Sequence, residues 1–424
     1  MWLEFLAGLG LSALAFYRLF FHPLHKYPGP ILAALTDWYE LYYNIVEGGA
    51  LITKIDDLHN LHETQLLFNE RHAYHDIYTY GSTLVKDPGF YFGFMAHGPQ
   101  GLVSTCDPED AKNRRSLLGP MFSRRAVLEL EFTVQLKMAM AYRSITTDVI
   151  TEYCFAESAN TLTPGFDHPI QIWIQRHFPF LNSLTSKAPQ KLVRWLLPGY
   201  KSYVEMKNQY ERQIDGLLKN PDSLSGTNHE TIYHHLLNPK NQAPLSRKTL
   251  VDEAFTLVGA GSETVGGVCT VGTFYALKNR TIYRKLLEEL CKAWPDKDMP
   301  MSYLALEKLP YLTAFIKEAL RFSIGVCHPL PRIVGASTEI GGYRIPSGTV
   351  VEMSPVFLHM NPDVFPDPYT FNPDRWLTGS TSEMVLDLAP FSKGPRICLA
   401  WCELYLIFGN IFRNLKMTLL DAGS

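Results

Sequence analysis

One decapeptide near the C-terminal end decides the fold: Phe391-Ser-Lys-Gly-Pro-Arg-Ile-Cys398-Leu-Ala400. An apolar helical pattern from Trp401 to Phe412 follows at once, so Cys398 stands between a loop and a helix. The unpaired N–H groups of a helix start and the nearby Arg396 both favour thiolate over thiol, which is the form that binds a metal. Gly394 permits a tight turn against a flat ligand, and Arg396 offers that ligand a fixed cation. The alternative for any single thiol here is a buried structural cysteine.

The decapeptide resembles the haem-binding loop of cytochromes P450, whose form is Phe-x-x-Gly-x-Arg-x-Cys-x-Gly. Phe391, Gly394, Arg396 and Cys398 match in place, and Ala400 stands where the family has glycine. The resemblance implies that Cys398 is the axial thiolate ligand of the iron in haem b. It also implies that Phe391, Gly394 and Arg396 contribute to binding this cofactor.

Composition bounds the class of protein. With 424 residues, of which 46% are hydrophobic and 19% charged, the chain can bury a large core. A net charge of −3 gives no electrostatic footprint for nucleic acid. The seven cysteines are scattered without a Cys-x-x-Cys pair, which argues against a disulfide framework and for a reducing compartment. Cys398 and Cys402 are four residues apart, but two ligands make no zinc site.

Residues 1–21 predict a membrane anchor helix. Their apolar run, interrupted by Glu4, Ser12 and Arg18, has about the twenty residues that span a bilayer. The basic residues Arg18 and Lys26 follow the run and would keep the rest of the chain cytosolic. Two alternatives are a cleaved signal peptide, which would place its positive charge before the apolar run, and a buried core helix.

Residues 22–30 form the next segment, and they contain three prolines that fix φ and remove hydrogen-bond donors. The segment looks like the proline-rich hinge of microsomal P450s. The resemblance therefore implies a single-pass protein of the endoplasmic reticulum membrane, with a cytosolic haem domain at residues 31–424. Length alone would suggest two or three domains, whereas the resemblance implies one. Within it, Ile31–Val46 predicts a first helix that Gly48-Gly49 ends.

Thr249–Leu277 predicts a long helix with five glycines, at 259, 261, 266, 267 and 272. Each interior glycine costs roughly 1 kcal/mol relative to alanine, which suggests close approach to something flat. Ala260-Gly-Ser-Glu-Thr264 resembles the P450 oxygen-binding motif, so Glu263 and Thr264 are the implied catalytic pair. An acid and a hydroxyl can relay the protons that bound O₂ requires. The alternative is a core helix in which Thr264 bonds the carbonyl four residues earlier.

A second helix should begin at Leu309-Pro310, and it carries Glu318 and Arg321 three residues apart on one side. Alone this is a common surface pair. Followed by Phe371-Asn-Pro-Asp-Arg375-Trp376, it resembles the P450 ion network that holds the segment before the haem loop. Glu318, Arg321 and Arg375 are therefore expected to stabilise the fold and retain haem, because a buried acid tolerates no loss of its partner.

Two further arginines are candidates for the haem propionates. Asp107 and Pro108 predict the N-cap and first position of a helix that resembles the third long helix of P450s. Arg115 matches the arginine of that helix, but Ala111 occupies the position of its aromatic partner. Arg332 lies on a predicted short strand, where the family often has a basic residue. A solvated helix face is the alternative for Arg115.

The expected fold is mainly α-helical with a small β-sheet, a P450 fold shortened in places. Leu51–Glu70 reads as polar helix where the family has a strand pair, and the chain is also short near 130–140. It stops at Ser424, where P450s continue into a final β-hairpin.

The resemblance implies a monooxygenase that inserts one atom of O₂ into a hydrophobic small molecule, with electrons from NADPH–cytochrome P450 reductase. The hinge and the Tyr153-Cys-Phe-Ala segment look most like fungal P450s of secondary metabolism, which suggests a terpenoid or polyketide substrate. Two alternatives remain. One is a haem-thiolate isomerase or dehydratase, against which the Glu263–Thr264 pair speaks. The other is a non-catalytic, degenerate P450-like haem protein, which the shortened segments and Ala111 favour.

Overall fold

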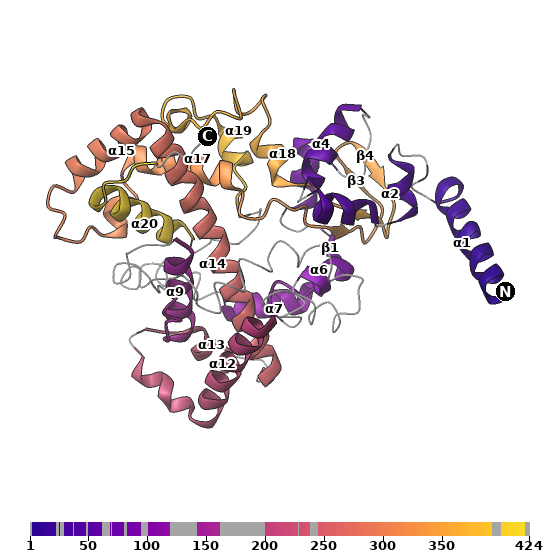
Figure 1. Cartoon of the computed structure of the whole chain (residues 1–424), viewed down its shortest axis with the longest axis horizontal. Helices are drawn as coiled ribbons and strands as arrows, with labels where there is room; N and C mark the ends of the chain where they lie inside the picture. The colour runs from indigo at the N-terminus through magenta and orange to yellow at the C-terminus, as the bar shows by residue number, and fades with distance from the viewer. Residues whose placement is uncertain are drawn as a thin grey trace.

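Helices dominate the part of the chain that the computed structural model describes. It describes residues 2–22, 25, 29–36, 38–47, 50–61, 68, 70–79, 83–94, 101–118, 142–161, 200–227, 229–237, 245–391 and 400–419. Two small antiparallel sheets accompany the helices. The prediction of a mainly α-helical fold with a small sheet is therefore confirmed (Figure 1).

The helices, in chain order, have these bounds: α1 (Trp2–Phe20), α2 (Ile31–Leu35), α3 (Trp38–Leu41), η1 (Tyr42–Val46), α4 (Leu51–Leu61), α5 (Arg71–Ile77), α6 (Pro88–Phe94), α7 (Pro108–Leu118), α9 (Tyr142–Phe155), α12 (Tyr200–Lys219), η3 (Pro221–Gly226), α13 (Ile232–Leu237), α14 (Arg247–Lys278), α15 (Arg280–Ala293), α16 (Tyr303–Leu306), α17 (Pro310–Ser323), α18 (Pro355–His359), η4 (Pro373–Trp376), α19 (Ser382–Asp387) and α20 (Ala400–Asn414).

The long helix α14 runs through the middle of the molecule (Figure 1). Its start is fixed by Ser246, whose side chain accepts a hydrogen bond from the backbone N–H of Thr249. The sequence predicted this helix over Thr249–Leu277, and it extends one or two residues further at each end. Helices α9, α12, α17 and α20 pack against it.

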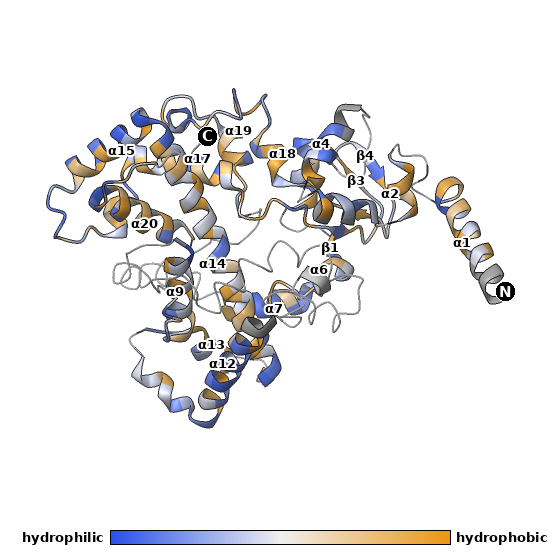
Figure 2. Ribbon diagram, viewed as in Figure 1, coloured by the Kyte–Doolittle hydropathy of each residue, from blue (hydrophilic) through white to orange (hydrophobic). Residues whose placement is uncertain are grey.

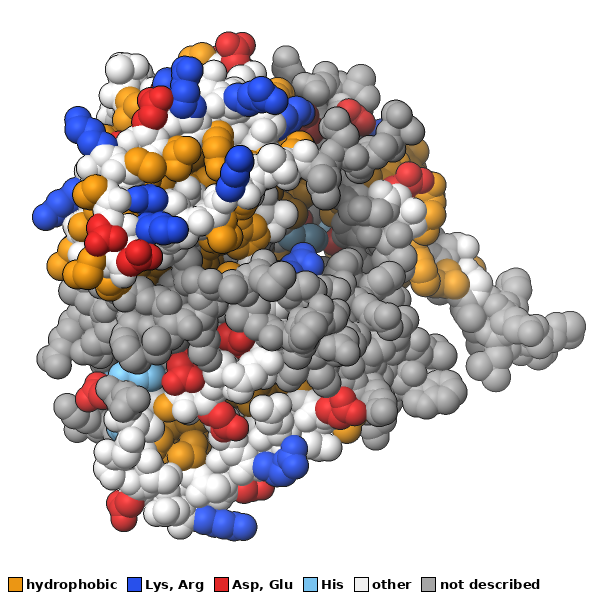
Figure 3. All heavy atoms as spheres, turned by 60° about the vertical axis from the view of Figure 1, so that its left-hand side comes forward, with side chains coloured by type: hydrophobic (Ala, Val, Ile, Leu, Met, Phe, Trp, Pro, Cys, Tyr) orange, Lys and Arg blue, Asp and Glu red, His pale blue; other side chains and the backbone are white. Residues whose placement is uncertain are grey.

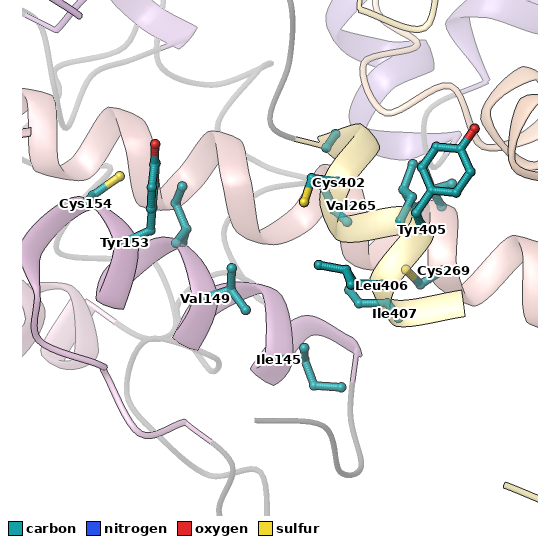
Figure 4. Packing of buried hydrophobic residues seen from close by; sticks show 14 of the residues in the cluster. Ile145, Val149, Tyr153, Cys154, Val265, Cys269, Cys402, Tyr405, Leu406 and Ile407 are labelled. Carbon is teal, nitrogen blue, oxygen red and sulfur yellow. The ribbon is translucent and has the colours of Figure 1, made fainter. Parts of the chain in front are cut away.

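The main core lies where α9, α14 and α20 meet. The buried cluster includes Val149 and Tyr153 of α9, Val265 of α14 and Leu406 of α20. In Figure 4 Val265 and Leu406 lie close together, and Tyr153 lies towards the other end of α9. These residues are almost fully buried. Burying such side chains contributes roughly 1.5–3 kcal/mol each, so this junction is a major source of the stability that holds α14 in place.

The small sheets lie on the other side of α17 from this core. Strands β1 (Val85–Lys86), β2 (Arg332–Ile333) and β5 (Val350–Val351) form one antiparallel sheet, in which Lys86 pairs with Arg332. Strands β3 (Thr338–Ile340) and β4 (Tyr343–Ile345) form a hairpin. Gly341 and Gly342 form its two-residue turn with positive φ, the backbone conformation that a tight hairpin requires.

The first predicted helix is wrong as a single element. Ile31–Val46 is divided into α2, α3 and η1. Thr36, which follows α2, is extended, with φ −155° and ψ 144°. Its hydroxyl accepts a hydrogen bond from the N–H of Trp38 at 3.2 Å. Threonine side chains compete in this way with helical hydrogen bonds, and the apolar periodicity did not show it. In contrast, α4 confirms that Leu51–Leu61 is helical rather than a strand.

The N-terminal helix α1 projects from the body of the molecule in Figure 1 and carries hydrophobic residues, orange in Figure 2. It contacts α2, where Arg18 Nη1 donates to the carbonyl oxygen of Leu35 at 2.8 Å. Leu9, Leu11 and Phe16 are exposed on α1. Among the described residues, no helix combines the length and the apolar character needed to cross a bilayer. The membrane-spanning helix expected at residues 1–21 is therefore not supported by the structure.

The surface drawn in Figure 3 carries charged side chains of both signs. Lys and Arg side chains gather in its upper part, where apolar side chains lie between them, and Asp and Glu side chains are more frequent in its lower part. This distribution agrees with the small net charge of the chain.

Candidate active site along helix α14

Three of the five glycines of α14 serve contacts between helices rather than a flat ligand. A Cβ on Gly261 would lie 2.7 Å from Ile150 Cγ1 of α9, and one on Gly272 would lie 2.7 Å from Phe408 Cζ of α20. A Cβ on Gly266 would approach Arg143 Cγ to 3.1 Å. For these three, the interpretation as a surface for a flat ligand is wrong, since neighbouring helices occupy the space.

The other two glycines leave one side of α14 open. Among the described residues, a Cβ on Gly259 would meet nothing within 4 Å, and one on Gly267 would meet only Ser323 Oγ at 3.6 Å. These positions are eight residues apart, with Glu263 midway between them, so all three lie on the same side of the helix. This side of α14 therefore has room for a planar group beside Glu263.

Glu263 is a half-buried acid, and one of its two oxygens is bound by a cation. Arg143, at the start of α9, places Nη2 3.1 Å from Glu263 Oε2. Oε1 is buried and has no hydrogen-bond partner among the residues that the structure describes. Burial raises the pKa of Glu263, and the Arg143 guanidinium acts in the opposite direction. Burial therefore favours the protonated carboxyl group, and Oε1, which makes no hydrogen bond to the described residues, can carry the proton.

The hydroxyl of Thr264 does not bond to Glu263. Thr264 Oγ1 donates to the carbonyl oxygen of Ala260 at 2.8 Å. A Cβ on Gly325 would lie 3.1 Å from Thr264 Cβ, so the chain after α17 passes directly over this residue. The structure therefore brings Thr264 against the segment that begins at Ile324, while Glu263 is held by α9.

Ser262 faces the opposite way, into the contact with α9. Its carbonyl oxygen accepts a hydrogen bond from Thr146 Oγ1 at 2.8 Å. Its own hydroxyl is fully buried and has no hydrogen-bond partner among the described residues. Ser262 thus belongs to the α9–α14 interface and not to the open side of α14.

The guanidinium group of Arg332 has N–H groups that make no hydrogen bond to the described residues. Its hydrogen bonds to Tyr91 Oη (2.6 Å), Leu330 O (3.2 Å) and Pro331 O (3.0 Å) all use Nη1. Within the described part of the chain, Nη2 and Nε make no such bond. The guanidinium also lies over the ring of Tyr78. A guanidinium held in place with two free donors suits an acidic group such as a haem propionate.

Arg115 lies half-buried on α7, whose start is as predicted. Asp107 Oδ1 accepts hydrogen bonds from the N–H groups of Glu109 and Asp110, at 3.0 and 2.8 Å. The preceding residue, Arg114, forms an ion pair with the buried Glu253 of α14, at 2.7 Å. Glu253 therefore fixes α7 against α14, and no local sequence pattern indicates this contact.

Of the decapeptide, the structure describes Phe391 and Ala400. Phe391 is half-buried and packs edge-on against Trp401 of α20, with ring centroids 6.3 Å apart. The expected cofactor and metal residues Gly394, Arg396 and Cys398 lie outside the described residues.

Glu318, Arg321 and Arg375 lie together. Arg321 donates to both carboxylate oxygens of Glu318, at 3.0 and 2.8 Å. Arg375 Nε donates to Oε1 at 3.2 Å, and Trp376 Nε1 donates to Oε2 at 2.9 Å. All four side chains are buried. The network fixes α17 to η4, in the chain that leads to the decapeptide.

The residues in place fit haem b. The open side of α14 can take a planar group, Arg332 can take an acidic one, and the buried Oε1 of Glu263 has no partner in the described part of the chain. Sequence reasoning missed Arg143 and Glu253, because their partners are distant in the chain and come together only through helix packing.

Comparison with known proteins gives a consistent result. The family model described as "Cytochrome P450" matches residues 94–424. The chain is 32% identical to a tryptophan 6-hydroxylase of Fusarium equiseti over 462 residues, covering 97% of this chain and 89% of that protein. It is 33% identical to an N-acetyltryptophan 6-hydroxylase of Emericella nidulans, covering 96% and 88%. A conidiogenone synthase of Penicillium rubens is 31% identical, covering 99% and 92%.

The fold has a match among solved structures as well. A crystal structure of a cytochrome P450 superposes with a TM-score of 0.66 at 18% identity, covering 80% of this chain and 81% of that one. The alignment of 462 residues with the Fusarium protein is longer than the 424 residues of this chain. That relative therefore has segments without a counterpart here, as expected for a fold that is shortened in places.

Proposed function

The chain belongs to the cytochrome P450 family, and from this we propose which of its residues carry the chemistry. As a P450 monooxygenase it binds haem b and uses O₂ and a reductase to oxidise a small molecule in secondary-metabolite biosynthesis. The proposal assigns metal binding to Cys398 and proton handling to Glu263 and Thr264. One observation carries it: Glu263 is a half-buried acid whose Oε1 has no partner among the described residues, and it lies between Gly259 and Gly267 on the open side of α14.

The cofactor would be held from both sides. Cys398 would bind the iron as thiolate, while Phe391, Gly394 and Arg396 would complete the decapeptide side. Arg115 and Arg332 would bind the propionates, and the two free donors of Arg332 support its part. Glu318, Arg321 and Arg375 would retain haem by fixing the chain that enters the decapeptide. When bound, haem b supplies the iron at which O₂ is activated.

Glu263 would deliver protons. Burial favours its protonated form, and its Oε1 needs no bond to be broken before it donates. Once its hydroxyl turns away from the carbonyl of Ala260, Thr264 Oγ1 would take a proton from Glu263 as it passes its own hydroxyl proton to the open side of α14, so the hydroxyl stays neutral and Glu263 is left as carboxylate. A side-chain rotation of this kind takes picoseconds to nanoseconds for an accessible residue, so it would not limit turnover.

The substrate is proposed to be a hydrophobic small molecule, with terpenoids and polyketides as the first classes to screen. Two similar proteins are named as hydroxylases of tryptophan and of N-acetyltryptophan, which adds indole amino acids as a second class. A direct screen is the shift of the Soret band when a substrate displaces water at the iron. A class that gives no saturable shift is eliminated.

The proposed location is the endoplasmic reticulum membrane, with NADPH–cytochrome P450 reductase as the electron donor. Exposed apolar side chains on α1 continue on α2 and α3, where Ile31, Leu32 and Trp38 are exposed. This surface would attach the chain to the membrane and leave the haem domain in the cytosol. Its removal should release the protein from microsomes.

Turnover with purified reductase tests the proposed function. Product should form only when NADPH and O₂ are both present. Product formed without NADPH would instead indicate an isomerase or dehydratase, and failure to retain haem would indicate a degenerate chain.

A further inference from the structure

His359 connects two parts of the chain that the proposed function requires to be fixed. It ends α18 and is fully buried. Its Nε2 accepts a hydrogen bond from the backbone N–H of Ala389 at 2.9 Å. Its Nδ1 lies 3.1 Å from the carbonyl oxygen of Arg321, and its own carbonyl oxygen accepts from Arg321 Nη1 at 2.7 Å.

The two hydrogen-bond partners of His359 determine which ring nitrogen carries the hydrogen. The N–H of Ala389 can only donate, so Nε2 must carry the lone pair. The carbonyl of Arg321 can only accept, so Nδ1 must carry the hydrogen. Burial lowers the pKa of His359 to about 3, which keeps the ring neutral. One ring nitrogen thus serves each partner.

The two partners differ in what fixes them. Arg321 belongs to α17 and is held by both oxygens of Glu318. Ala389 is buried and lies two residues before Phe391, the first residue of the decapeptide. Just before it, the carboxylate of Asp387 binds Arg71 and His75 of α5, with His75 Nε2 at 2.9 Å. Ala389 is therefore the last point before Phe391 at which a side chain from another element binds the described backbone.

We propose that His359 is a positioning residue, which transmits the fixed place of α17 to Ala389 and so sets where the decapeptide begins and how Cys398 meets the iron. The inference rests on the proposed role of Cys398. It assigns to His359 no contact with substrate or cofactor. The bond from Nε2 to Ala389 carries the function, whereas the bond from Nδ1 to Arg321 only orients the ring.

Replacing His359 by Gln or by Asn tests the bond to Ala389 and the bond to Arg321 separately. In His359→Gln the terminal amide reaches the place of Nε2, so its oxygen can accept from Ala389. In His359→Asn the shorter side chain reaches the place of Nδ1, so it can serve Arg321 and not Ala389. His234→Asn is the control, since the ring of His234, on α13, likewise joins two backbone groups, the N–H of Thr231 just before α13 and the carbonyl oxygen of Leu224 on η3.

Hydrogen exchange and the spectrum of the reduced, carbon-monoxide-bound protein are measured on the purified full chain. Because Pro390 has no amide hydrogen, short peptides ending there report on Ala389. We expect His359→Asn to exchange this hydrogen roughly tenfold faster and to lose the thiolate-type Soret band. His359→Gln and His234→Asn should resemble the wild type in both measurements.

The proposal is overturned if the Asn and Gln variants behave alike, whether both keep the band, both lose it or both fail to fold. If only the Asn variant fails to fold, the Gln variant decides: a retained band and slow exchange support the proposal, and their loss overturns it. A wild-type protein without a thiolate band would refute the role of Cys398, whereas the exchange of Ala389 would still decide the role of His359.

Discussion

Glu263 is held from one side only, and this makes its proposed role testable at the level of single residues. Arg143 binds Oε2, while Oε1 has no partner among the described residues. The burial of the carboxyl raises its pKa, and Arg143 limits the rise. The acid and the cation therefore have separable effects on turnover and on its pH dependence.

Replacing Glu263 by Gln should reduce product formation roughly 100-fold, because a positioned proton donor is lost while the shape of the side chain is kept. The rate of product formation per haem measures this effect. Consumption of NADPH should fall less than product, since electrons can still reach O₂ without productive proton delivery. Equal turnover in the Gln variant would remove Glu263 from the relay.

Arg143→Met is the matched change on the other side of the pair. It leaves the carboxyl in place and removes the cation that lowers its pKa, so the pKa should rise. If the protonated acid is the active form, the alkaline limb of the pH profile of kcat/KM should move to higher pH. A shift to lower pH would contradict the assignment of Glu263 as proton donor.

At the scale of elements, the Glu318 network joins α17 to η4 and to the chain that enters the decapeptide. Glu318→Gln should lower the free energy of unfolding by about 3–5 kcal/mol, because two buried guanidinium groups lose their counter-charge. Urea unfolding measures this change. The matched control is Asp374→Asn, which breaks the half-exposed pair with Lys285 and should cost less than about 1 kcal/mol. Similar losses in both variants would contradict this ranking.

The glycines of α14 provide a second comparison between elements. Gly261→Ala should lower the free energy of unfolding by about 1–3 kcal/mol, since the new Cβ would lie 2.7 Å from Ile150 Cγ1. Gly259→Ala should raise it by up to about 1 kcal/mol, because alanine is the better helix former and nothing lies within 4 Å. Thermal unfolding of the two variants gives the sign directly. A stabilising Gly261→Ala would show that α9 does not pack as closely as the structure has it.

Helices α14 and α17 also show which features can be predicted from the sequence and which cannot. The start of α17 could be predicted because Pro310 marks a helix start, and the extent of α14 could be predicted to within two residues at each end. The glycines of α14 could be noticed but not interpreted. Whether a missing Cβ faces a helix or open space depends on packing between distant segments, and no local pattern contains that information.

The residues of the candidate site also differ in whether the sequence alone could reveal them. Glu263, Thr264 and the Glu318 network could be found because their spacing matches a known family. Arg143, Glu253 and His359 could not, since their partners lie far along the chain and each residue type is common at surfaces. The single helix predicted over Ile31–Val46 was wrong for a local reason. Thr36, just after α2, is extended, and its Oγ1 accepts a hydrogen bond from the N–H of Trp38.

At the scale of the whole molecule, one acid in the core should control how stability depends on pH. Burial raises the pKa of Glu403, on α20, to about 8, and its Oε2 is buried without a hydrogen-bond partner among the described residues. The folded protein therefore binds a proton that the unfolded chain releases between about pH 4.5 and pH 8. Stability from this group is complete below that window and falls as the pH rises through it.

Glu403→Gln should remove this contribution, so its free energy of unfolding should exceed that of the wild type increasingly as the pH rises to about 8. Urea unfolding at several pH values gives the two curves. Glu352, whose pKa burial raises to about 7, acts in both proteins and cancels in the difference. Parallel curves would show that Glu403 titrates normally in the folded protein.

Cys398 is the proposed ligand through which this chain binds haem b. The reduced, carbon-monoxide difference spectrum reports directly on that ligand. The wild type, expressed with ample haem, should give a thiolate-type Soret band that disappears in Cys398→Ala. Cys402→Ala is the matched control, because Cys402 lies four residues further along the sequence and its thiol is buried in the core, so the band should persist. A well-folded wild type without the band, or a band that survives in Cys398→Ala, would contradict the account.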